Sequence, residues 1–211
     1  PFPSRADRLA SPGRSPASED TGEALVLNPA NLGFLTGKEL RWTGVRCTDT
    51  QRVACGHSFD LSTPLSFIGL NNTGVFLNYS YLDSEVNDEF GKRRFNSQAE
   101  SVFNVGFIQD IPTFGAAFGM TYRKQGEAYS RVVGEEVTTT YGADLEAFIE
   151  KRIGKNMVVR LTGSNLLDAK KKETFNKFTT IANQVDRSFD EYELEQEKAG
   201  PVFQLTARMA F

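Results

Sequence analysis

The sequence has no run of about 20 apolar residues, the length that an α-helix needs to cross a bilayer. A helical membrane protein is therefore excluded. A membrane β-barrel is not, because its apolar residues alternate with polar ones and give a weak hydropathy signal. The chain opens on Pro1 without a charged-then-apolar leader, so we expect that a signal peptide was removed or that the chain is a fragment.

Histidine and the residue patterns of enzymes are also scarce. Histidine occurs once, at His57, with no cysteine or carboxylate at ligand spacing, so we interpret it as a surface residue. Nucleophile elbows, phosphate-binding loops, zinc-ligand spacings and dinucleotide fingerprints are missing from the sequence. We predict no enzymatic activity, no catalytic residue, no metal site and no cofactor. The formal net charge of −3 also gives no reason to expect nucleic acid as a partner.

Cysteine occurs only twice, at Cys47 and Cys55, on either side of the stretch TDTQRVA. In an oxidising compartment such a pair closes a short loop as a disulfide. Two unpaired thiols are the alternative, and the sequence leaves both states open.

Alternation of apolar and polar residues is the strongest pattern that the sequence contains. In GVFLNYSYLDS, for example, Val75, Leu77, Tyr79 and Tyr81 share one face of an extended strand. Each regular run is about as long as the ~9–11 residues that a tilted strand needs to cross a bilayer. The pattern predicts strands at residues 38–47, 57–64, 74–84, 101–111, 113–125, 141–153, 156–168 and 201–211.

Long and short connections alternate between these strands. The long polar links are 85–97, 126–135 and 169–190, and the short ones include the stretches DIPTFG and IGKN. Long loops on one side and tight turns on the other are typical of an outer-membrane barrel, in which the long loops are extracellular. The sequence therefore predicts an all-β, antiparallel, up-and-down transmembrane β-barrel of about eight strands, which is a partial barrel.

The polar face of the strands carries charged residues that we expect to line a wet lumen. In a soluble sheet the same residues would face solvent, but another element would then have to cover the apolar face. No amphipathic helix of useful length is visible for that task. The lumen-facing candidates are Arg123, Asp144, Glu146, Arg160 and Arg208.

Four stretches, GVFLNYSYLDSEV, GKRRFNSQ, VVRLTGSNLLDAKK and PVFQLTARMAF, resemble the C-terminal barrel region of TonB-dependent outer-membrane receptors. The resemblance covers about residues 58–211. Its most specific parts are the Asn-Leu-Leu-Asp of residues 165–168 and the closing Phe211.

The resemblance implies a bacterial outer-membrane protein that takes part in uptake of a scarce nutrient of the siderophore, cobalamin or saccharide class. It implies outer-membrane lipid, the barrel assembly machinery and a small-molecule ligand of unknown identity as partners. TonB becomes a partner only if a plug domain and a TonB box exist upstream, because this sequence contains neither. A small structural or adhesive eight-stranded outer-membrane barrel and a soluble β-rich binding domain are the alternatives.

In that family the last strand is the signal read by the assembly machinery, with an aromatic last residue and apolar residues at every second position before it. The matching residues are Phe203, Leu205, Ala207, Met209 and Phe211.

Composition divides the chain into three parts. Residues 1–22 are rich in Pro, Ser, Arg and Asp and are predicted to be disordered. Residues 23–57 are strand-forming, but the resemblance does not cover them, so we expect a composite chain or a fragment. Residues 58–211 form the receptor-like barrel region.

Overall fold

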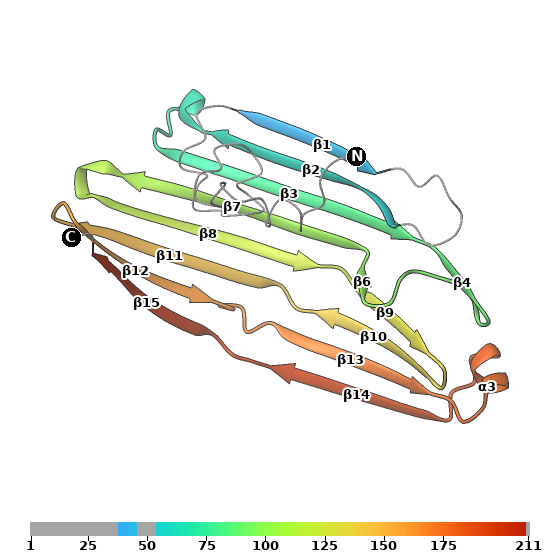
Figure 1. Ribbon diagram of the computed structural model, residues 1–211. Helices are drawn as coiled ribbons and strands as arrows, with labels where there is room; N and C mark the ends of the chain where they lie inside the picture. Colours follow the sequence, from blue (N-terminus) through green and yellow to red (C-terminus); the bar gives the residue numbers. More distant parts are fainter. Residues whose placement is uncertain (1–37, 46–53, 210–211) are drawn as a thin grey trace.

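The computed structural model describes residues 38–45 and 54–209, and this part of the chain is all-β with antiparallel sheets (Figure 1). The predicted disordered segment 1–22 lies outside the described residues, as do most of 23–57. None of the described helices is long and apolar enough to cross a membrane.

The main sheet has eight strands, each hydrogen-bonded to its neighbours in an antiparallel ladder. In spatial order the strands are β1 (Glu39–Val45), β2 (Ala54–Pro64), β3 (Thr73–Ser84), β7 (Ser101–Ile111), β8 (Ala116–Gln125), β11 (Asp144–Ile153), β12 (Met157–Ser164) and β15 (Val202–Met209). These are the eight predicted strands, with ends that differ by a few residues. Among the described residues β1 and β15 are not paired with each other, so this sheet is open and no closed barrel is formed.

A second sheet continues several strands of the main sheet beyond a bend (Figure 1). Its five strands are β14 (Glu191–Lys198), β13 (Lys170–Lys177), β10 (Glu135–Tyr141), β9 (Ala128–Val132) and β6 (Gln98–Ala99). A small two-stranded sheet pairs β4 (Val86–Asp88) with β5 (Gly91–Arg93). The prediction of long polar links without strands at 85–97, 126–135 and 169–190 is therefore wrong in part. The strands β4, β5, β9 and β13 and the start of β10 lie there.

The bend between the sheets follows from residues that leave the extended conformation. Asn165 and Asp168 both have φ of 53°, and Gly200 has φ of 73°. The left-handed region favours glycine and asparagine, so a strand cannot run straight through these positions. The predicted strand 156–168 therefore ends at Ser164, and its Asn-Leu-Leu-Asp stretch forms a turn.

Short turns join the strands at the end of the main sheet that lies opposite the second sheet. The first contains the 3-10 helix η3 (Ser66–Ile68), the second contains η4 (Pro112–Phe114), and the third is the link between β11 and β12. At the far end, the link between β13 and β14 contains the short helix α3 (Ile181–Val185). From β2 to β15, short connections between strands of the main sheet alternate with longer ones as predicted, although the longer ones contain strands of their own.

The core of the described residues is small. Its buried hydrophobic residues are Phe76, Ala99, Ala128 and Phe178. Ala99 and Ala128 face each other across β6 and β9, and Phe178 follows β13. Most large apolar side chains of the main sheet therefore lie outside any core.

Candidate functional site

One face of the main sheet is apolar from edge to edge. The register between strands places apolar side chains beside one another in continuous rows across the strands. One such row consists of Leu40, Leu61, Leu77, Val105, Tyr122 and Leu145. The face is uncovered by the described residues: Leu40 is 74% exposed and Leu205 is 71% exposed.

Charge is distributed unequally between the two faces. In the described strands of the main sheet, the apolar face carries only the charged residues Asp83, Lys124 and Lys151, and each lies within two residues of a strand end. The Lys124 ammonium donates to the Tyr141 carbonyl, and the Lys151 ammonium donates to the Phe114 carbonyl. The charged residues of the opposite face are Glu39, Arg41, Asp60, Asp110, Arg123, Asp144, Glu146, Glu150, Arg152, Arg160 and Arg208.

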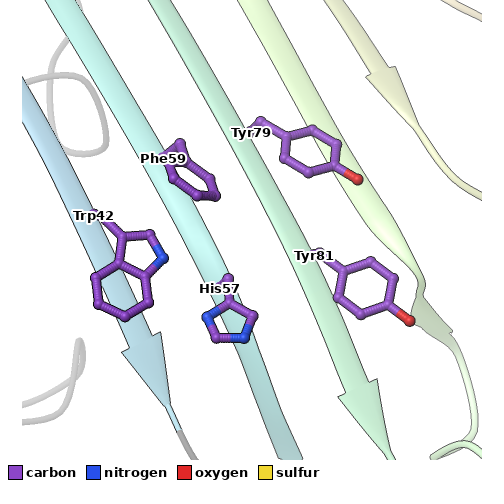
Figure 2. A pocket seen from close by; sticks show the side chains of 5 residues that line it. All are labelled: Trp42, His57, Phe59, Tyr79 and Tyr81. Carbon is purple, nitrogen blue, oxygen red and sulfur yellow. The ribbon is translucent and has the colours of Figure 1, made fainter.

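Aromatic side chains gather on the apolar face at its bend end (Figure 2). They surround a shallow depression of about 550 Å³ lined by Trp42, His57, Phe59, Tyr79 and Tyr81. The rings of Trp42 and His57 are stacked, with centroids 5.7 Å apart and an angle of 14° between their planes. His57 is exposed, in agreement with its interpretation as a surface residue. Tyr and Trp combine an apolar body with a polar tip, which suits a boundary between apolar and aqueous surroundings.

A row of polar residues crosses the opposite face of six strands at right angles to the chain direction. Its members are Arg41, Asp60, Asn78, Asn104, Arg123 and Asp144. The Asn78 amide donates to the Asp60 carboxylate, and the Asn104 amide donates to the Asn78 carbonyl oxygen at 3.1 Å. Arg123 Nη2 lies 3.2 Å from Asp144 Oδ2. We call these six residues the polar row.

All five residues predicted to face a lumen lie on this polar face, and the structure brings two of them into contact. Arg123 and Asp144 form the ion pair at the end of the polar row. Arg160 is placed differently, because it pairs with Glu150 at 3.7 Å and lies 3.9 Å above the centre of the Phe148 ring. The remaining two lie elsewhere: Glu146 is opposite Thr121, and Arg208 is opposite Val158.

The sequence analysis did not name four members of the polar row as site residues: Arg41, Asp60, Asn78 and Asn104. Each occupies the polar position of its own strand, so the alternation contained part of the signal. What joins them is the register between strands, which is set by long-range pairing.

Two glycines of the polar face leave room for aromatic rings. A Cβ atom on Gly106 would come within 2.4 Å of the Phe76 ring, and one on Gly119 would come within 2.6 Å of the Phe148 ring. Phe76 is only 5% exposed although it lies on the polar face. A glycine within a strand often marks such a close approach. Each ring thus lies against the backbone of the next strand and covers it.

The predicted assembly residues share the apolar face of β15, which is an edge strand of the main sheet among the described residues. Phe203, Leu205 and Met209 are exposed there, and Ala207 lies between them in the same alternation. The predicted end of this signal, Phe211, lies outside the described residues. Of the two cysteines, Cys55 takes part in a disulfide, and Cys47 lies outside the described residues.

A buried ionic cluster joins the β4–β5 hairpin to the second sheet. The Arg131 side chain is 3% exposed, and its Nε lies 2.9 Å from Glu136 Oε1. Burial alone would raise the pKa of Asp88, but the hydrogen bond from Arg93, a backbone hydrogen bond and the charges of Arg93 and Arg131 outweigh it and lower that pKa. Burial also raises the pKa of Tyr129, whose hydroxyl accepts from Arg131 at 3.0 Å. The sequence analysis did not predict this cluster.

Within the described ranges, no group of three or more His, Cys, Asp or Glu side chains is placed to hold a metal ion. No family model, curated protein or solved structure matches the chain. Its geometry is therefore the basis for a functional proposal.

Proposed function

We propose that this chain forms part of the wall of an outer-membrane β-barrel, as the C-terminal barrel region of a TonB-dependent receptor. The apolar face of the main sheet would contact lipid, and the polar face would line a water-filled lumen. The activity would be uptake of a scarce nutrient of the siderophore, cobalamin or saccharide class, without catalysis.

The observation that carries the proposal is the confinement of charge on the apolar face to the strand ends. Ten residues at about 3.3 Å each, in a strand tilted by about 40°, span about 25 Å, which is the height of the apolar band of such barrels. The strands β8 and β11 each have 10 residues. Lys124 and Lys151 would lie at the two borders of the band, where long basic side chains reach water.

The open edges favour a larger barrel over one that eight strands complete alone. An unpaired strand edge in a bilayer leaves backbone N–H and C=O groups without partners, at several kcal/mol for each group. Since β1 and β15 are both edges among the described residues, a membrane-inserted form needs further strands beside them. A receptor barrel would supply these strands, together with a plug domain and a TonB box.

Fluorescence of the single tryptophan, Trp42, offers a direct test. In phospholipid vesicles, with the further strands supplied in tryptophan-free form, we expect lipids brominated near the headgroup to quench Trp42, because it lies near the bend end of the apolar face. A Trp42→Phe background then allows a matched pair, Leu77→Trp on the apolar face and Asn78→Trp on the polar face. Lipids brominated along the acyl chain should quench tryptophan at 77 strongly and at 78 weakly. Equal quenching at the two positions would contradict the proposal.

A second test separates a receptor from a small structural barrel. If the coding sequence upstream of these residues contains a plug domain and a TonB box, the receptor assignment is supported. A complete gene without them would favour the structural or adhesive barrel.

A further inference from the structure

Two segments of the chain that belong to neither large sheet are attached to the same β-hairpin. Residues 85–96 contain the β4–β5 pair, and residues 179–189 contain α3. Both segments contact the β9–β10 hairpin of the second sheet. The contacts described next are made by side chains, from the segments or from the hairpin, rather than by a shared strand ladder.

Asn96 attaches the first segment. Its side-chain Nδ2 donates to the Arg131 carbonyl at 3.0 Å, and its Oδ1 accepts from the Arg131 backbone N–H at 3.0 Å. One carboxamide thereby forms the two hydrogen bonds that an antiparallel neighbour would exchange with this residue. Arg131 adds a second contact, since its Nη1 donates to the Phe90 carbonyl at 3.3 Å and lies 3.6 Å from Asp88 Oδ1.

Gln184 attaches the second segment in the same way. Its Nε2 donates to the Val132 carbonyl at 2.8 Å, and its Oε1 accepts from the Gly134 N–H at 2.8 Å. Gln184 is 1% exposed, so both of these hydrogen bonds are shielded from water. Loss of a buried partner is costly, because the group that remains has no water to replace it.

The hairpin has its own support, which does not depend on either segment. Arg131 is held by Glu136 and Tyr129, both of which belong to the hairpin. The β10 strand is paired with β9 on one side and with β13 on the other. Release of a segment therefore leaves the ladder of the second sheet intact.

We propose that the β9–β10 hairpin carries two independent latches, one at Asn96 and Arg131 and one at Gln184. Each latch holds its own segment against the hairpin. Each breaks without the other and without loss of the hydrogen bonds between strands of the second sheet. The segments 85–96 and 179–189 thus move separately, and the β9–β10 hairpin to which both attach stays in place.

Amide hydrogen exchange on the full chain tests the independence of the latches. The matched variants are Asn96→Ala and Gln184→Ala, each of which removes one carboxamide. Each variant loses two hydrogen bonds to the hairpin, which predicts a rise in exchange of about tenfold or more. Asn96→Ala also loses the hydrogen bond that Asn96 Oδ1 accepts from Arg93 Nη1 at 2.7 Å, which lies within the first segment. In Asn96→Ala the rise should appear in residues 85–95 and not in 179–189, and Gln184→Ala should give the reverse.

Limited trypsin digestion gives a second measurement, because Lys92 lies in one segment and Arg187 in the other. Each variant should accelerate cleavage at its own site only. Three results would overturn the proposal: both segments opening in either variant, neither segment opening in its own variant, or loss of protection in β10 and β13. The last result would mean that the segments are an integral part of the second sheet.

Discussion

Arginine substitution at two adjacent positions of β8 tests which face of the main sheet contacts lipid. Met120 lies near the middle of the strand on the apolar face, opposite Phe107 and Ala147. Thr121 lies on the polar face, opposite Gly106 and Glu146. Met120→Arg places a charge among apolar side chains, whereas Thr121→Arg places it beside a carboxylate.

The two substitutions differ in expected magnitude. An arginine that faces lipid near the midplane destabilises a barrel by about 2–4 kcal/mol, and a surface substitution in water usually changes stability by less than about 0.5 kcal/mol. We expect Met120→Arg to lower the free energy of unfolding by about 2–4 kcal/mol, or roughly 30- to 900-fold in the equilibrium constant. Thr121→Arg should be close to neutral, because Glu146 offers a partner across the strand pair.

Equilibrium unfolding by urea measures both values under the same conditions, in phospholipid vesicles that hold the chain together with the further strands beside β1 and β15. Met120→Gln is the matched control, because it has a similar length and no charge. A near-zero effect of Met120→Arg, or an equal loss in the two arginine variants, would refute the assignment of the apolar face to lipid.

The pKa of Asp88 is lower in the folded protein than its unfolded value of 3.8. The Asp88 carboxylate therefore stabilises the folded state above pH 3.8, and this stabilisation is lost as the pH falls through the lower pKa of the folded protein. Exchange in residues 85–96, corrected for the intrinsic rate, should therefore rise in that acid range, and Asp88→Asn should abolish this pH dependence. In urea unfolding, Asn165→Ala should destabilise the protein more than Asn165→Gly. Both variants lose the hydrogen bonds of the Asn165 side chain with Gly200 and Ala169, at a cost of ~2 kcal/mol, but only alanine adds backbone strain at a φ of 53°. Equal losses would mean that backbone strain is unimportant there. Deletion of Phe211 should leave synthesis and detergent refolding nearly unchanged but reduce assembly in the outer membrane of cells; normal assembly would reject the assignment of a terminal signal.

The eight strands of the main sheet could be predicted because their two faces differ in polarity. The predicted strand 101–111 has the bounds of β7, and the prediction 74–84 differs from β3 by one residue. Alternation is a local signal, because the polarity of a residue indicates which face of its own strand it occupies, whichever strands lie beside it. The polar row was not predicted as a unit, because its members come from six strands and meet only through long-range register.

The second sheet could not be predicted, because the two faces of its strands differ little in polarity. Its strands carry polar residues on both faces, as in the Thr138–Thr140 run of β10 and the glutamate-rich β14. Without one consistently apolar face, a strand has a weak binary pattern, so polarity alone made these segments look like loops. The buried Arg131 cluster was hidden as well, because an arginine in a polar stretch is exposed in most proteins.

The place where the alternation stops therefore has a physical meaning. The strands alternate strongly up to the level of Tyr81 and Lys124, and the bend follows at once, where the Gly126 N–H donates to the Ser101 carbonyl at 2.7 Å. The aromatic depression lies at the same end of the sheet (Figure 2). The continuous apolar face of the main sheet thus ends at the level where Tyr and Trp gather. In the proposed barrel this level is the outer surface of the membrane, since interfacial aromatic residues and the loss of an apolar face both mark the change from lipid to water.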